Sequence, residues 1–219
     1  MVEPERVPRD MGWREIAEID ARLERGEIDE PGWHAAMANL IRPAYLAAAT
    51  PWEGSGKQGT RDDWEYARSH VADAIDRDGR FLDVGCANGF LLECVPRWTP
   101  HRLEPYGLDI IPELVDLARS RLPELRDRLF VGNVMEWEPP NRFTYVRTGL
   151  EYVPAMRRGE LLERLRGWCD RVIIGPMSEP ADSPTEQLLA EWGHPATGRS
   201  ERLHRRIPGA VYRVLWVDA

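Results

Sequence analysis

The chain has 219 residues and a formal net charge of −8 at pH 7, and 42% of its residues are hydrophobic, enough for one α/β domain with a buried core. The acidic balance argues against a nucleic-acid partner, because proteins bind phosphates through Lys and Arg. There is no long apolar run, no basic start followed by an apolar segment, and no cysteine framework. We therefore expect a cytoplasmic protein without a membrane span, secretory signal, disulfide or metal centre.

Three amphipathic helices are predicted in the first 78 residues. Asp10 is a candidate N-cap of the first, and Asp29 precedes the second, which has Pro31 in its first turn. Thr60 can cap the third helix. We assign residues 1–78 to a helical extension that determines substrate specificity.

The segment between the second and third helices is rich in glycine. It is not a Walker A loop, because Pro51 stands in place of the first glycine and Gln58 replaces the Ser or Thr. Two interpretations remain open. The segment is either a mobile loop that closes over a ligand, with Lys57 or Trp52 at its tip, or a plain linker.

The most informative stretch is 81–93, FLDVGCANGFLLE, which predicts a strand, a tight turn and a helix. Gly85 and Gly89 allow the backbone to pass close to a ligand, and the new helix presents unpaired N–H groups. This is half of a nucleotide-type site in a doubly wound sheet. Ala87 interrupts the G-x-G-x-x-G fingerprint of NAD-binding proteins, and Ala still permits a tight turn if its φ is negative. A plain strand-to-helix turn is the alternative interpretation.

A second strand is predicted over 103–110 and ends in an acidic residue. Asp109 lies 20 residues after Gly89, where a carboxylate can accept two hydrogen bonds from a ribose diol. The alternative is a solvated residue at a strand end. Pro112 begins the next helix, and Pro123 ends it.

Two further strands are predicted at 129–131 and from residue 143. Asn133 follows a glycine after the first of them, and its amide oxygen can accept a hydrogen bond from a ligand. Asn after Gly is also ordinary turn chemistry. Glu151 and Tyr152 lie in the loop after the second strand.

The last part of the chain alternates helices with strands. We predict a helix over 161–168, a buried strand over 171–176 closed by Gly-Pro, and a helix over 185–192 capped by Ser183 or Asp182. A terminal strand over 209–217 pairs with one near 198–205 as a hairpin. The arginines at 157–158 and between 199 and 206 are interpreted as solvated faces with a few ion pairs.

These segments, in this order from residue 81 to 154, resemble class I S-adenosylmethionine (SAM)-dependent methyltransferases. The run from Asp83 to Gly89 resembles their motif I, D-x-G-x-G-x-G, with Ala87 in place of the middle glycine. The resemblance implies a Rossmann-like, doubly wound, mostly parallel seven-stranded sheet with a C-terminal antiparallel hairpin. It assigns 79–219 to the SAM-binding core and the N-terminal helices to a substrate lid.

The resemblance also implies a role for particular residues. Asp109 binds the ribose, and Asn133, in place of the usual Asp, accepts from the adenine amino group. Thr144 replaces a usual Asp, and Tyr152 a usual His. The full cofactor-binding set implied is Asp83, Gly85, Cys86, Ala87, Asn88, Gly89, Asp109, Ile110, Asn133, Val134, Arg147 and Thr148.

The function implied is methyl transfer from SAM to a small molecule such as a secondary metabolite. Tyr152 and Glu151 have the best positional claim as catalytic base, and His70, His101, His194 and His204 are better explained as surface or packing residues. The alternatives are an RNA or protein methyltransferase. From a different class come a non-catalytic SAM- or nucleotide-binding protein and an NAD-dependent enzyme with a degenerate loop.

Overall fold

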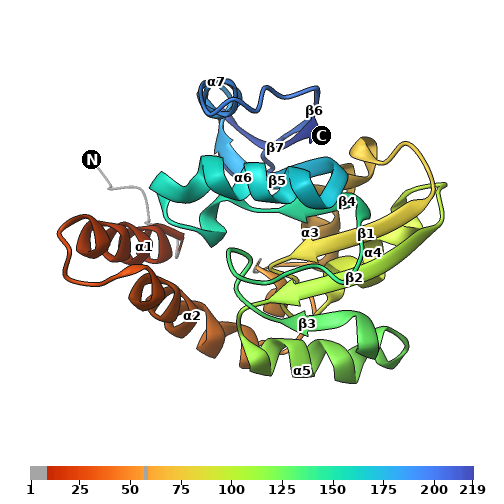
Figure 1. Cartoon of the computed structure of the whole chain (residues 1–219), viewed down its shortest axis with the longest axis horizontal. Coiled ribbons are helices and arrows are strands. Elements are labelled where there is room, and N and C mark those ends of the chain that lie inside the picture. The colour runs from red at the N-terminus through yellow and green to blue at the C-terminus, as the bar shows by residue number, and fades with distance from the viewer. Residues whose placement is uncertain (1–8, 57–58) are drawn as a thin grey trace.

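The computed structural model describes residues 9–56 and 59–219, and the side chains from residue 15 onward. Seven strands form one sheet of order β3-β2-β1-β4-β5-β7-β6 (Figure 1). Strands β1 to β5 are parallel, and β7 is antiparallel to both β5 and β6. The predicted doubly wound fold with an antiparallel C-terminal hairpin is confirmed. The strands are β1 (Gly79–Val84), β2 (Leu103–Asp109), β3 (Leu129–Val131), β4 (Phe143–Thr148), β5 (Cys169–Pro180), β6 (Gly198–Leu203) and β7 (Ala210–Asp218).

Helices cover both faces of the sheet. One face packs against α3 (Arg61–Arg68), α4 (Phe90–Trp98) and α5 (Pro112–Arg121), and the other against α6 (Arg158–Trp168) and α7 (Thr185–Glu191). Two helices, α1 (Arg9–Glu24) and α2 (Glu30–Leu46), precede them. The short 3₁₀ turns are η1 (Glu53–Ser55), η2 (Ser69–Ala74), η3 (Pro123–Arg128), η4 (Leu150–Tyr152) and η5 (Ala155–Arg157).

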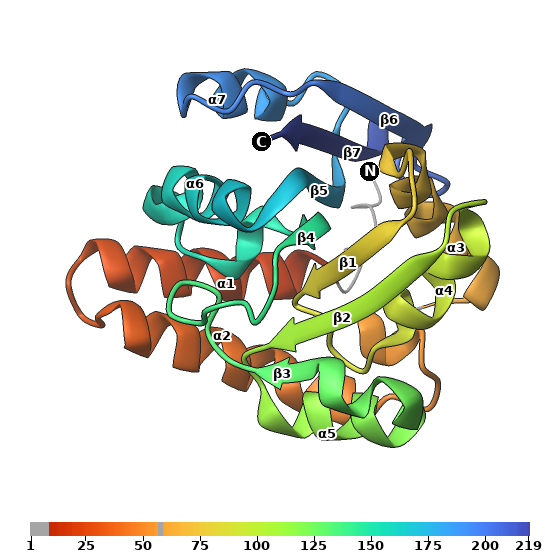
Figure 2. The same ribbon diagram turned by 45° about the vertical axis from the view of Figure 1, so that its right-hand side comes forward.

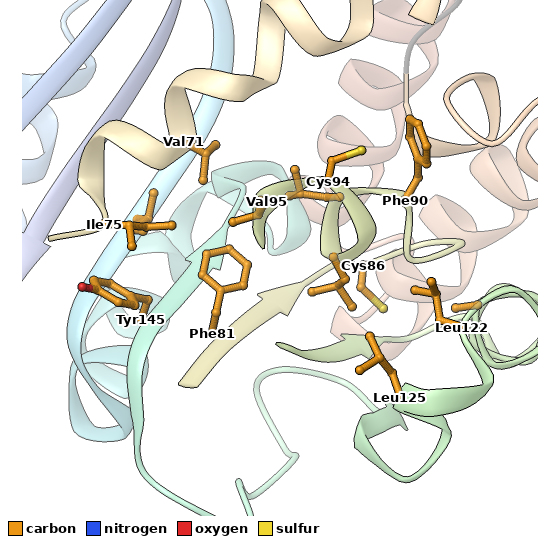
Figure 3. Packing of buried hydrophobic residues seen from close by; sticks show 14 of the residues in the cluster. Val71, Ile75, Phe81, Cys86, Phe90, Cys94, Val95, Leu122, Leu125 and Tyr145 are labelled. Carbon is orange, nitrogen blue, oxygen red and sulfur yellow. The ribbon is translucent and has the colours of Figure 1, made fainter. Parts of the chain in front are cut away.

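Alternation along β1 divides the core into two layers. Phe81 belongs to one cluster with Val71 of η2 and Val95 of α4, and Figure 3 shows these side chains converging on the sheet. Leu82 belongs to the opposite cluster, with Leu165 of α6. Successive side chains of a strand point to opposite faces. Because helices cover both faces of this sheet, the side chains on both sides of a central strand are mostly apolar and buried.

The two later N-terminal helices begin where the capping residues predict. The Asp29 carboxylate accepts from the Gly32 amide at 2.9 Å, and the Thr60 hydroxyl accepts from the Asp63 amide at 3.1 Å. These bonds satisfy N–H groups that have no partner inside the helix. The prediction for α1 is wrong, because the helix already includes Arg9 and Asp10 therefore lies inside it.

Two predicted boundaries near the C-terminus are also wrong. Strand β5 does not close at Gly175–Pro176: a register shift after Ile174 lets it continue pairing with β7 as far as Pro180. Helix α7 has Pro184 at its N-cap position with no side-chain cap. The Ser183 hydroxyl donates instead to the Glu179 carboxylate at 2.8 Å and does not cap the helix.

Within residues 9–56 and 59–219, no helix is both long enough and apolar enough to cross a lipid bilayer. The same part of the chain contains no group of three His, Cys, Asp or Glu side chains able to hold a metal ion. Cys86, Cys94 and Cys169 are buried free thiols.

Helix α2 lies across the carboxyl ends of the central strands. In both ribbon views the arrowheads of β1 and β2 end beside it (Figures 1 and 2). In open α/β sheets, ligands bind outside the carboxyl ends of the strands, where the strand order reverses. In this sheet that place lies between β1 and β4, beneath α2.

Candidate functional site

A cavity of about 110 Å³ lies at the carboxyl ends of β1 and β2. Its floor comes from the loops after β1, β2, β3 and β4, and its roof from α2. Residues more than 60 positions apart in the chain therefore meet in one space. The predicted site residues that line it are Gly85, Ala87, Asp109, Ile110, Asn133, Val134, Glu151 and Tyr152.

The other predicted site residues are not among those that line the cavity: Asp83, Cys86, Asn88, Gly89, Arg147 and Thr148. Asn88 holds the glycine loop in place, because its amide donates to the Pro51 carbonyl at 2.8 Å and its Oδ1 accepts from the Phe90 amide at 3.1 Å. Thr148 is fully buried, and its hydroxyl donates to the Gly149 carbonyl. Cys86 packs in the core beside Gly107, where burial raises the pKa of its thiol.

The loop after β1 has three residues with positive φ. Gly85 and Gly89 each have φ near 75°, as their lack of a Cβ permits, and Ala87 has φ 47°. The tight turn therefore forms without a negative φ at Ala87, the condition set from the sequence. The Ala87 amide donates to Asp109 Oδ2 at 2.8 Å, and this bond to the neighbouring strand stabilises the left-handed conformation.

Asp109 is a buried carboxylate in the wall of the cavity. It is 8% exposed, and besides Ala87 it accepts from the Ile111 amide at 2.9 Å. Burial raises the pKa of Asp109 to about 6, although the backbone donors oppose the shift. Each carboxylate oxygen has lone pairs beyond the one used, so the group can still accept from a ligand.

The adjacent part of the cavity is apolar with one polar group. Ile110 is 38% exposed and Val134 is 5% exposed, and both line the space. Asn133 lines it as well, while its Oδ1 accepts from the Met135 amide at 3.0 Å. Two apolar side chains and an amide suit a flat heterocycle that carries an amino group.

A buried ion pair joins β1 to β4 beneath the cavity. Arg147 Nη1 donates to Asp83 Oδ1 at 3.0 Å and to the Tyr152 hydroxyl at 3.2 Å, and Nε donates to the Gly175 carbonyl. The Tyr152 ring lies against Gly85, where a Cβ would stand 2.5 Å from its carbons. Burial raises the pKa of Tyr152, so its phenol stays protonated at neutral pH and is suited to donate a hydrogen bond rather than to act as a base.

His34 is a cavity residue that sequence reasoning missed. Its Nε2 is buried without a hydrogen-bond partner among the described residues, and the nearest carboxylate, Glu30, is 3.8 Å away. Burial lowers the pKa of His34, so the imidazole is neutral at pH 7 and can accept a proton. Helical spacing in the sequence could have pointed to His34, because positions 34, 38, 41 and 45 lie on one face of a helix. All four residues line the cavity.

The other four histidines do not line the cavity. His70 contacts the Ser200 hydroxyl, and His204 accepts from backbone amides of its own turn. His194 contacts the Gly159 carbonyl, and His101 lies beside Asp78. Their contacts agree with the surface and packing roles expected of them.

The segment between α2 and α3 is partly ordered by hydrogen bonds. The Trp52 indole donates to the Gly59 carbonyl at 3.0 Å, and the Trp64 indole donates to the Ser55 carbonyl at 3.2 Å. Lys57 and Gln58 lie outside the described residues. A lid role for this segment stays a prediction.

Comparison with known proteins gives structural matches only. No family model matches the chain, and no curated protein sequence matches it. The solved structure of magnesium protoporphyrin IX methyltransferase ChlM from Synechocystis PCC 6803 with bound SAM matches with a TM-score of 0.56 and 15% identity, over 83% of this chain and 96% of that one. The chain has the fold of the class I SAM-dependent methyltransferases.

Other proteins with this methyltransferase fold also match over most of this chain. The pyocyanin biosynthetic protein PhzM matches with a TM-score of 0.53 and 15% identity, over 94% of this chain and 69% of that one. Ribosomal protein L11 methylase from Lactobacillus delbrueckii subsp. bulgaricus matches with a TM-score of 0.51 and 16% identity, over 74% and 80%. Because these proteins differ in what they are named for, the fold does not select an acceptor class.

Proposed function

We propose that this protein transfers a methyl group from SAM to a small-molecule acceptor. The observation that carries the proposal is the buried Asp109 carboxylate, which lines a cavity beside the glycine loop at the carboxyl end of β2. In this fold, that position suits a ribose diol. The two backbone bonds to Asp109 hold the carboxylate and the loop in one arrangement.

The remaining cavity residues fit the other parts of the cofactor. Adenine would lie between Ile110 and Val134, with its amino group toward Asn133. The methionine part would pass over Gly85 toward the ends of β1 and β4, where Asp83 and the backbone of 147–148 lie. The missing side chain of Gly85 leaves room for the Tyr152 ring, which borders this path.

For methyl transfer, the protein has to position the acceptor beside the methyl group and to remove one proton from the acceptor. When bound, SAM supplies an activated methyl group on a sulfonium. The apolar roof of α2 excludes water, and proximity provides much of the acceleration. Tyr152 can orient an acceptor by donating a hydrogen bond, while Glu151 and the neutral His34 can accept a proton from an acceptor hydroxyl.

The shape of the site supports a small acceptor. Four apolar residues of α2, Trp33, Met37, Ala38 and Ile41, line the cavity from above. The arginine clusters do not offer a free basic surface: Arg205 and Arg206 pair with Asp63, Arg199 with Glu186, and Arg157 with Glu30 and Glu160. A nucleic-acid substrate would need such a surface.

A cofactor panel tests the proposal. Isothermal titration should show binding of SAM and S-adenosylhomocysteine and no binding of NAD or NADP. Binding of NAD with no heat from SAM would assign the site to a different class of enzyme. Transfer of labelled methyl from SAM to members of a small-molecule library, against tRNA and protein pools, then separates the acceptor classes. Cofactor binding without transfer to any of them would favour a non-catalytic SAM-binding protein.

A further inference from the structure

Two tyrosines that line the cavity each have a guanidinium group beside them. Arg147 Nη1 donates to the Tyr152 hydroxyl at 3.2 Å. On the opposite side, a Cβ added at Gly56 would stand 2.8 Å from the Tyr45 hydroxyl and 3.2 Å from Arg68 Nη2. The Tyr45 hydroxyl and the Arg68 guanidinium therefore face the same small space between α2 and α3.

The two arginines differ in how their charge is balanced. Arg147 is paired with Asp83 at 3.0 Å. No carboxylate of the described residues forms an ion pair with Arg68, whose Nη2 donates only to the Ser55 carbonyl at 3.1 Å and whose guanidinium lies 4.9 Å from the centre of the Trp64 ring. A guanidinium has five N–H donors, so within the described residues most of those of Arg68 make no hydrogen bond.

The surroundings of Arg68 are unfavourable for an uncompensated cation. Burial and the positive charge of Arg147 lower the pKa of Arg68 to about 10, far below that of an ordinary arginine. The side chain remains charged at neutral pH. Arg68 is half-buried, and a guanidinium taken partly out of water without a counter-ion would gain from a charge-assisted bond to an anion.

The local charge indicates which anion fits. Arg147 lies near two acidic side chains, Asp83 and Glu151, whereas Arg68 has no ion pair within the described residues, so Arg68 is the positive charge that a ligand could pair with. A carboxylate carries one negative charge and matches the planar fork of a guanidinium, whereas a phosphate monoester carries nearly two. Burial raises the pKa of Tyr45, so its hydroxyl remains a donor that can support the same anion.

We propose that Arg68 and Tyr45 bind a carboxylate group of a ligand that enters the cavity beside Gly85. This inference rests on the proposed function for the identity of that ligand. The carboxylate belongs either to the amino-acid part of the cofactor or to the methyl acceptor. In both cases Arg68 is a binding residue that the glycine-loop motif does not contain.

The first test compares two adenosine ligands. S-adenosylhomocysteine has the amino-acid carboxylate, and 5′-methylthioadenosine lacks it. If the cofactor supplies the carboxylate, Arg68→Met should weaken S-adenosylhomocysteine by about tenfold or more and change the affinity for methylthioadenosine by less than about twofold. Tyr45→Phe should show a smaller loss of the same kind. Arg102→Met, at an exposed arginine far from the cavity, is the matched control.

The second test addresses the acceptor. Benzoate is titrated into the S-adenosylhomocysteine complex, with benzamide as neutral control and the fluorescence of Trp64, which stacks on Arg68, as readout. If the acceptor supplies the carboxylate, benzoate should bind the wild type and not Arg68→Met, while benzamide binds neither. Retention of both S-adenosylhomocysteine and benzoate affinities in Arg68→Met would overturn the inference.

Folding and the proposed function are checked separately. Arg68→Lys keeps the charge and loses the fork, so it should give an intermediate affinity, and it replaces Arg68→Met in both tests if the latter does not fold. If the wild type binds neither adenosine ligand, the proposed function fails. The inference then stands or falls on benzoate binding to the unliganded protein.

Discussion

Asp83 and Arg147 form a buried ion pair, 3.0 Å between Oδ1 and Nη1, that joins the end of β1 to the end of β4. Their side chains are 2% and 9% exposed. Arg147 also donates to Tyr152 and to the Gly175 carbonyl, so one guanidinium connects two strands, the bulge of β5 and the wall of the cavity. The acidic residue of the motif therefore fixes the floor of the site.

Loss of either partner of this pair should destabilise the fold. Asp83→Asn or Arg147→Met leaves a buried charge without its counter-ion, which costs about 3–5 kcal/mol. The double variant should lose less than the sum, and urea denaturation measures all three. As control, Arg80→Met removes an exposed pair with Glu104 and should cost less than about 1 kcal/mol. Additive single effects would show that the two charges do not stabilise each other.

Asp109 should contribute most to cofactor affinity. Asp109→Ala removes an acceptor of ribose hydroxyls and should weaken S-adenosylhomocysteine by about 1.5–3 kcal/mol in titration calorimetry. The variant also loses the bonds from the Ala87 and Ile111 amides, so circular dichroism is used to check that it still folds. An unchanged dissociation constant in a folded variant would remove Asp109 from the site.

The same carboxylate should make binding depend on pH. Because the pKa of Asp109 in the free protein is about 6, the group is protonated below that pH and must ionise before it can accept two hydroxyl bonds. Affinity for S-adenosylhomocysteine should therefore rise with pH up to about 6 and level off above it, by as much as about tenfold per pH unit below the midpoint. Asp109→Asn should bind more weakly, with affinity nearly independent of pH over this range. A wild-type profile that is flat from pH 5 to 7 would contradict the assignment.

Asn133 offers a test of the adenine position. Asn133→Leu should weaken S-adenosylhomocysteine by about 1–2 kcal/mol, since the adenine amino group would be buried without an acceptor. Asn133→Asp should bind as well as the wild type or better, because a carboxylate oxygen can accept both from the ligand and from the Met135 amide. S-inosylhomocysteine carries a carbonyl oxygen in place of that amino group, so its binding should be weakened most by Asn133→Asp, because two acceptors would then face each other. Equal affinity of the wild type and the Leu variant for the adenine ligand would place the ring elsewhere.

Local patterns sufficed for the fold but not for the details of the site. The strand, the glycine turn and the acidic residue lie close together in the sequence. The order of the strands and the position of Asp109 could therefore be predicted. The φ of Ala87 could not, because it depends on a hydrogen bond to Asp109 across two strands. The pairing of Asp83 with the Arg147 side chain and the entry of His34 into the cavity likewise arise only when distant elements pack together.

The last prediction concerns α2 as the cover of the site. A cavity of about 110 Å³ is smaller than the roughly 300–1,000 Å³ of most ligand sites, so we expect α2 to move outward when a nucleoside enters. Its ties to the core near its ends are ion pairs at the protein surface, Glu30 with Arg157 and Arg42 with Glu113. The first pair is half-buried and the second is exposed, and ion pairs that remain in contact with solvent contribute little and allow opening.

Hydrogen exchange should detect this motion. Without ligand, amides of residues 30–46 should exchange faster than those of β1, and saturating S-adenosylhomocysteine should slow them, because the stripe of His34, Ala38, Ile41 and Tyr45 then packs on the bound nucleoside. Residues 52–56 and 59–66 should be protected too if the segment before α3 acts as a lid. Strands β6 and β7, far from the cavity, serve as internal reference. Unchanged exchange in 30–46 at full saturation would mean that the ligand enters without displacing α2, and the source of specificity would then have to be sought in the loops after β4.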